Sequence, residues 1–190
     1  NVERLILAYH YGIYPWYNPK DPILWWAPIP RYVIFPDKIK VSKSMRNYFN
    51  QNRFTVTYNQ NFDEVIHQCR IIKRKGQRST WITDLVIESY TELYRLGLIT
   101  SVEVWNQNGQ LAGGLYGINM GKVFFGESMF SLESNASKYG FITLAQRLQD
   151  EGYKVIDCQQ PNPHLESLGG EFISGGHFYQ MLFENRMLLL

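Results

Sequence analysis

The spacing of apolar and polar residues predicts helices in the first half of the chain. Helical spacing of apolar residues follows capping residues at Ser42, Asn61 and Thr83, and Gly97 closes the last of these segments. Between the helices, "FTVTYN" alternates as a strand does, and the proline- and aromatic-rich segment 12–31 predicts turns and extended chain. The predicted helices cover residues 3–12, 42–52, 61–76 and 83–97.

From residue 101 onward the pattern changes to that of a sheet. Apolar segments separated by an Asn-Gly and a Met-Gly turn predict a β-meander over residues 101–131. A helix over about 134–151, capped by Ser134 or Asn135, and an apolar strand, "YKVIDCQ", follow. Helices beside a mainly antiparallel sheet define the α+β class. This order of elements is that of the N-acetyltransferase-like (GNAT-like) fold.

The composition is that of a compact folded chain. Its 190 residues, 45% apolar and 15% aromatic, are enough for one substantial core. Cys69 and Cys158 have no zinc-like spacing, and so few cysteines favour a reducing compartment. The first thirty residues have the pattern of neither a secretory signal nor a membrane span. We therefore expect a cytoplasmic protein that needs no metal, no cofactor and no membrane.

The charged residues are unevenly distributed, although the net charge is only +2. A cluster of this kind is usually a solvated face, but two in an otherwise balanced chain also permit a groove that follows phosphates. The first cluster consists of Lys38, Lys40, Lys43 and Arg46. The second consists of Lys73, Arg74, Lys75 and Arg78.

Glu127 stands out because it lies inside "FFGESMFS", a run that otherwise predicts a buried strand. A carboxylate in such a place is costly to desolvate unless it meets a cation or several donors. In a regular strand Glu127 would share one face with Phe125 and Met129, and Phe124 would lie on the other. Either a Lys or Arg of the same chain pairs with Glu127, or the carboxylate awaits a cationic ligand.

Ten short motifs occur along the chain: "GIYPWY", "WWAPIPR", "FPDKIKVSKSMR", "TWIT", "LGLITSVEVW", "GGLYG", "FFGESMFS", "NASK", "IDCQ" and "PHLESLGG". Together they resemble the leucyl/phenylalanyl-tRNA–protein transferase family, in that family's order over roughly residues 3–183. The resemblance implies transfer of Leu or Phe from an aminoacyl-tRNA to the N-terminal Arg or Lys of a protein, which marks that protein for degradation by the N-end rule. It also implies a small N-terminal domain, 1–60, before an acetyltransferase-like catalytic domain, 61–190.

The resemblance assigns the two substrate side chains to different residues. Glu127 matches the carboxylate that pairs with the acceptor's Arg or Lys side chain. Leu115, Phe124 and Leu144 match the apolar pocket for the Leu or Phe side chain, although core packing is the ordinary role of any one of them. Such a pocket separates side chains by only about 1–3 kcal/mol per methylene, so we expect graded use of Leu, Phe and Met.

The chemistry is expected at "IDCQ", where the resemblance makes Asp157 and Gln159 the catalytic pair. On a strand these two side chains face the same way and Cys158 faces the core. Asp157 would orient or polarise Gln159, whose amide oxygen can accept a hydrogen bond from the attacking amine. Since Gln has no useful pKa, Gln159 would position the amine rather than act as a conventional base. Cys158 is not expected to act as a nucleophile.

The tRNA is expected to be held by stacking and by phosphate contacts. Trp26 and Trp81 match segments of the family and offer faces to the terminal adenosine, though tryptophans of this number also fill cores. The first basic cluster, Lys38, Lys40, Lys43 and Arg46, would follow the acceptor stem. A monomer is the simplest expectation for the assembly.

Two other classes of function share some of these features. A small-molecule acetyltransferase needs a glycine-rich pyrophosphate loop that opens a helix, and the nearest match, "QLAGGL", lies between predicted strands. A non-catalytic module that binds basic N-termini or RNA would explain the charges, but it gives no reason for Asp157 and Gln159.

Overall fold

The computed structural model describes residues 1–73 and 80–188. The described helices are α1 (Val2–His10), η1 (Pro36–Lys38), α2 (Lys43–Asn50), α3 (Phe62–Ile71), α4 (Asp84–Arg95), α5 (Ala136–Asp150), α6 (Pro163–Glu166) and α7 (Gly175–Asn185). The strands are β1 (Tyr14–Pro15), β2 (Trp25–Trp26), β3 (Arg31–Ile34), β4 (Thr55–Tyr58), β5 (Ile99–Trp105), β6 (Leu111–Met120), β7 (Val123–Ser131), β8 (Val155–Gln159) and β9 (Glu171–Ile173).

Within the described residues, seven strands form one sheet in the order β4-β5-β6-β7-β8-β3-β9, and β1 pairs with β2 separately. Every neighbouring pair in the large sheet is antiparallel except β7 and β8, which are parallel. Helix α5 makes the crossover that a parallel connection requires. The α+β class with a mainly antiparallel sheet is therefore confirmed.

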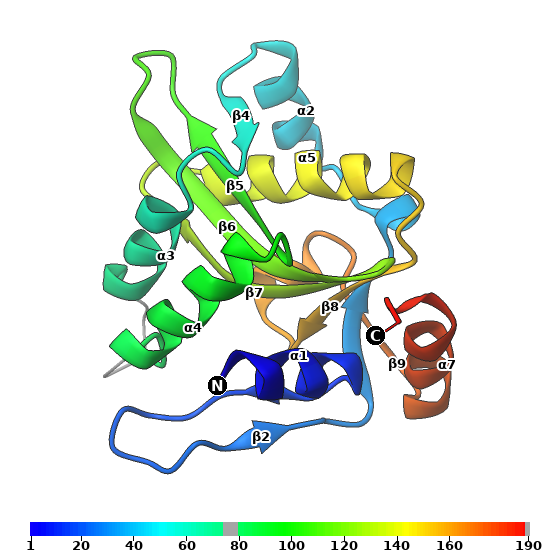
Figure 1. Ribbon diagram of the computed structural model, residues 1–190. Coiled ribbons are helices and arrows are strands. Elements are labelled where there is room, and N and C mark those ends of the chain that lie inside the picture. The colour runs from blue at the N-terminus through cyan, green and yellow to red at the C-terminus, as the bar shows by residue number, and fades with distance from the viewer. Residues whose placement is uncertain (74–79, 189–190) are drawn as a thin grey trace.

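The sheet lies between two layers of helices (Figure 1). One apolar core joins the sheet to α1, α3, α4 and α7, and it includes Tyr9, Tyr90 and Phe125. The other joins the opposite face to α2 and α5, and it includes Leu115 and Phe124. Both faces of the central strands are buried, which explains their long apolar runs. No helix in residues 1–73 and 80–188 is long and apolar enough to cross a bilayer.

Capping residues and the spacing of apolar residues predicted the positions of most elements. The side chains of Ser42 and Thr83 cap α2 and α4 as predicted, by accepting the N–H groups of residues 45 and 86. Asn61 and Asn135 make no capping bond through their side chains. The N–H of Ser137 in α5 is instead satisfied by the hydroxyl of Ser131 at the end of β7. Helix α3 ends at Ile71, and the predicted end at residue 76 lies outside the described residues.

Some elements of the sheet were not predicted. Strand β3 inserts between β8 and β9, and α7 packs against the sheet through Phe178 and Leu182. Strands β3 and β4 both come from the first sixty residues, so that segment contributes to the same sheet as the rest of the chain. The division into a small N-terminal domain, 1–60, and a catalytic domain, 61–190, stays a prediction.

Candidate active site

A cleft of about 260 Å³ opens where β7 and β8 separate. Their parallel pairing ends at Phe125 opposite Asp157, so the chain beyond these residues leaves the ladder. A methyl group at Gly126 would meet only the carbonyl oxygen of Asp157, at an ordinary 3.5 Å, so this glycine faces open space. The cleft is lined by Trp16, Trp81, Leu115, Tyr116, Gly126, Glu127, Ser128, Met129, Phe141, Cys158, Gln159, Asn162 and Leu165.

A β-bulge brings Glu127 to the cleft. Gly126 pairs with Gly117 of β6 and Ser128 pairs with Tyr116, so Glu127 has no partner opposite it. In a regular strand, residues five apart face opposite sides of the sheet. Phe125 and Phe130 belong to the same core, so the extra residue of the bulge reverses the alternation between them. The prediction that Phe125, Glu127 and Met129 share one face was therefore wrong.

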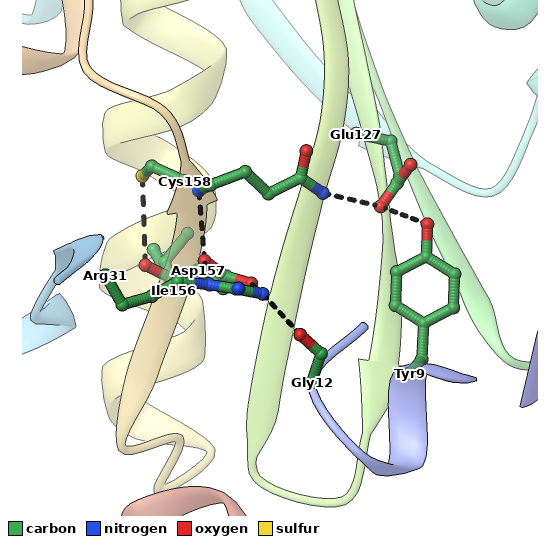
Figure 2. Close-up of polar contacts among 8 residues, drawn as sticks. Tyr9, Gly12, Arg31, Glu127, Ile156, Asp157 and Cys158 are labelled. Atoms are coloured by element: carbon green, nitrogen blue, oxygen red, sulfur yellow. Dashed lines mark hydrogen bonds and ion pairs between the residues drawn. The ribbon is translucent and has the colours of Figure 1, made fainter. Parts of the chain in front are cut away.

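The carboxylate of Glu127 is held by neutral donors. Its Oε1 accepts hydrogen bonds from the Tyr9 hydroxyl at 2.8 Å and from Gln159 Nε2 at 3.1 Å, and its Oε2 accepts one from the Tyr90 hydroxyl at 3.0 Å. Figure 2 shows Tyr9 reaching Glu127 from α1. Among the described residues no Lys or Arg forms an ion pair with Glu127. Within the described residues, Glu127 is therefore not paired with a Lys or Arg of its own chain.

The surroundings of Glu127 bring its titration close to neutral pH. Burial raises the pKa of Glu127 to about 7, the bonds from Tyr9 and Tyr90 oppose this rise, and the nearby charge of Asp157 adds to it. The hydroxyls of Tyr9 and Tyr90 are also only 2.7 Å apart. A bound cation would favour the ionised form.

Gln159 and Asp157 lie on opposite sides of the cleft wall. Gln159 lines the cleft, whereas Asp157 is 0% exposed and accepts both Arg31 Nε at 2.9 Å and Arg31 Nη2 at 2.7 Å. Asp157 also accepts the backbone N–H of Gln159 at 3.0 Å. Cys158 lines the cleft, so the predicted facing of this strand was wrong at its end. Burial raises the pKa of the Cys158 thiol well above its ordinary value, so a thiolate is disfavoured.

Comparison with known proteins decides the family. The family model for leucyl/phenylalanyl-tRNA protein transferase matches residues 33–183, and the model for its N-terminal domain matches residues 1–29. The chain belongs to the leucyl/phenylalanyl-tRNA–protein transferase family. Proteins of that name from Flavobacterium johnsoniae and Christiangramia forsetii are 57% and 53% identical to it, over 95% of this chain and 84% and 85% of theirs. The resemblance drawn from the motifs is thereby confirmed.

The chain also has a weaker likeness to a solved structure. The structure of L-PGS from Bacillus licheniformis is 13% identical, with a TM-score of 0.48 over 85% of this chain and 51% of that one.

The residues that the family resemblance assigns to the aminoacyl pocket lie in one apolar core. Leu115 lines the cleft, and Phe124 and Leu144 are fully buried in the same core. Phe141, which the sequence did not single out, lines the cleft as well. The aminoacyl pocket stays a prediction, with Leu115 at its surface.

The predicted tRNA contacts are spread more widely. Trp81 lines the cleft, and Trp26 lies beside it, since its Nε1 donates to the backbone oxygen of the cleft residue Trp16 at 2.7 Å. The first basic cluster, Lys38, Lys40, Lys43 and Arg46, does not line the cleft. Lys38 lies near the carboxyl end of α5. Its Nζ is 3.9 Å from Oε1 of Glu171. Of the second cluster, residues 74–78 lie outside the described residues.

Sequence reasoning missed Tyr9, Tyr90 and Arg31 as parts of this site. Tyr9 and Tyr90 lie on α1 and α4, 118 and 37 residues from Glu127 in the chain. Arg31 lies 126 residues from Asp157. Arg31 ends the motif "WWAPIPR", which was the one signal that could have drawn attention to it.

Proposed function

We propose that this cleft transfers Leu or Phe from an aminoacyl-tRNA to the N-terminal Arg or Lys of a protein, as an aminoacyltransferase. The observation that carries the proposal is Glu127, an ionisable carboxyl group at a cleft, held only by neutral donors among the described residues. A guanidinium or ammonium group entering the cleft would supply the missing charge. A charge-assisted contact of this kind contributes about 1.5–3 kcal/mol, enough to select a basic side chain over a neutral one.

The contact between Gln159 and Glu127 supports a site in which the attacking amine would lie beside the recognised side chain. Because Gln159 Nε2 donates to Glu127, its amide oxygen is the atom left to accept a hydrogen bond from the acceptor's α-amine. The same two residues would therefore hold both ends of an N-terminal Arg or Lys. Asp157 would act from behind, through the backbone of Gln159.

The reaction needs positioning more than activation. The neutral α-amine attacks the ester carbonyl carbon of the aminoacyl-tRNA, a carbon–nitrogen bond forms, and the bond to the ribose oxygen breaks. The amine loses a proton and the departing ribose oxygen gains one, so no cofactor or metal is consumed. Since the ester is already activated, holding the amine within attacking distance can account for much of the rate.

The aminoacyl-tRNA would be bound by the other residues of the cleft and its surroundings. Leu115 would present the apolar pocket, with Phe124 and Leu144 behind it, and Met would be accepted more weakly than Leu or Phe. Trp81 and Trp26 would stack on the terminal adenosine. The first basic cluster, Lys38, Lys40, Lys43 and Arg46, would follow the acceptor stem away from the cleft.

The order of elements supports the finer fold prediction. The meander β5-β6-β7, the crossover helix α5 and the parallel strand β8 that splays from β7 are the pattern predicted for a GNAT-like domain. We propose that fold, with residues 1–60 as its smaller N-terminal part. We also propose that the protein acts as a monomer in the cytoplasm, where charged tRNA is present.

The acyl-CoA alternative is disfavoured by the placement of its best motif. "QLAGGL" lies at the start of β6, and Gly113 and Gly114 are paired on both sides in the sheet. It therefore does not open a helix N-terminus as a pyrophosphate loop does.

A transfer assay tests the proposed function. Radiolabelled Leu on its tRNA should be transferred to a peptide that begins with Arg, and not to the matched peptide that begins with Asp. Binding without transfer to the Arg peptide would favour the non-catalytic module. Label on neither peptide, with phenylalanyl-tRNA also inert, would overturn the proposal.

Acceptor binding should strengthen as the pH rises through about 7, because Glu127 is protonated below that pH and ionised above it. A peptide capped with a 5-guanidinopentanoyl group carries the Arg side chain without an α-amine, so its own charge is constant. Its Kd should fall about tenfold between pH 6 and pH 8. Calorimetric titration checks this, and Glu127→Gln should remove the pH dependence. An equally steep dependence in that variant would contradict the assignment.

A further inference from the structure

A buried arginine lies behind the wall of the cleft. The side chain of Arg31 is 1% exposed, and its guanidinium lies over the rings of Tyr14 and Phe178, 5.1 and 4.6 Å from their centres. Its Nη2 donates to the backbone oxygen of Gly12 as well as to Asp157 (Figure 2). Arg31 therefore joins the end of α1, which carries Tyr9, to the strand that carries Gln159. It does not line the cleft and cannot contact a substrate.

Gln159 has an unusual backbone conformation for a residue with a side chain. Its φ is 65°, in the left-handed region, and the N–H of Gln160 donates to the oxygen of Cys158 at 2.6 Å. A bond between residues two apart, around a positive central φ, is a γ-turn of the rare and strained kind. Such a conformation persists only where its surroundings hold it in place. The side chain that faces the substrates thus depends on restraints applied to its backbone.

Besides its pairing with Tyr32 of β3, the backbone of Gln159 is restrained by Asp157. Both carboxylate oxygens of Asp157 are bonded to Arg31, which fixes the rotation of the carboxylate. Oδ1 is thereby directed at the backbone N–H of Gln159, which it accepts at 3.0 Å. Of the bonds that link these residues, none joins Asp157 to the side-chain amide of Gln159.

We infer that Arg31 is a positioning residue for the transfer reaction, which holds Gln159 in its γ-turn through Asp157 and so aims the Gln159 amide between Glu127 and the attacking amine. The inference rests on the proposed function. In this inference Asp157 has a positioning role, because its ion-paired carboxylate accepts the backbone N–H of Gln159 and holds it in place. Loss of the pair would let Gln159 relax to extended backbone and withdraw its amide from Glu127.

The test is a double-mutant cycle measured by transfer of Leu to the Arg peptide. Arg31→Lys keeps the charge but cannot make the two-pronged bond, and it should lower kcat at least about tenfold with the KM of the peptide changed less than about threefold. Gln159→Gly accommodates the positive φ and removes the amide. In that background Arg31→Lys should change the residual single-turnover rate less than about threefold, because nothing remains to be positioned.

The outcomes separate this inference from the function on which it rests. An inert wild-type chain would overturn both. If the wild type is active, Arg31→Lys could lower the rate by the same factor with Gln159 and with Gly at position 159. A smaller folded fraction would give that result, and it would overturn the role of Arg31 alone. So would a folded Arg31→Lys protein with unchanged kcat. If thermal melting shows that Arg31→Lys does not fold, Asp157→Asn completes the same cycle, with the same coupling expected and additive losses again contradicting the inference.

Discussion

Replacing Glu127 by Gln should lower kcat/KM for a peptide beginning with Arg by about 10- to 150-fold. That range corresponds to the 1.5–3 kcal/mol of a charge-assisted contact. Gln keeps the size of the side chain. Its amide oxygen can accept one tyrosine hydroxyl and its NH2 group can donate to the other, so the fold should survive. The decrease should appear in kcat/KM for the acceptor peptide and not in that for the aminoacyl-tRNA, because Glu127 does not act on the ester. Steady-state transfer with each substrate varied in turn measures it.

Glu103 offers a matched control for that variant. It is another fully buried carboxylate held by neutral donors, among them the hydroxyls of Thr57 and Ser101, but it lies on β5 outside the cleft. Glu103→Gln should leave the ratio of rates with Arg and neutral acceptors unchanged. A similar loss of that ratio in both variants would mean that general weakening of the fold, and not acceptor recognition, explains the effect of Glu127→Gln.

Replacing Gln159 by Ala should lower kcat about 100-fold, the size of effect that loss of positioning at a reacting group produces. The KM of the acceptor should change much less, because Glu127 still binds its side chain. Single-turnover transfer from preformed leucyl-tRNA isolates the chemical step from product release.

Gln107→Ala is the matched change outside the site, since Gln107 is exposed in the turn between β5 and β6. It should have the rate of the unaltered chain. If Gln159→Ala left the single-turnover rate unchanged as well, the amide would have no part in aiming the amine. A rise in the KM of the acceptor with unchanged kcat would instead make Gln159 an additional contact for acceptor binding.

The parts of the fold that are determined by residues close together in the sequence could be predicted from it. The meander follows from alternation and from turns at which Gly109 and Gly121 adopt positive φ. Caps such as Ser42 and Thr83 act within three residues. Strand β3 could not be predicted in the same way, because its partners β8 and β9 lie more than a hundred residues away and its own segment is only four residues long.

The candidate site shows the same limit at the level of single residues. Glu127 could be singled out because a carboxylate in an apolar run is anomalous by itself. The bulge that turns it into the cleft could not, since a strand is read by its regular period and a one-residue insertion leaves no signature in a single sequence. Its tyrosine partners are ordinary apolar-face residues of two helices, and only the packing of those helices brings the hydroxyls together.

The central claim is that the charge of Glu127 selects the acceptor, and the most direct measurement compares two peptides. Their N-terminal residues are Arg and citrulline, which have nearly the same shape but differ by one positive charge. With the unaltered chain, kcat/KM for Arg should exceed that for citrulline by about 10- to 150-fold, and Glu127→Gln should reduce the ratio to within about threefold of unity. An unchanged ratio in the Glu127→Gln protein would contradict the account.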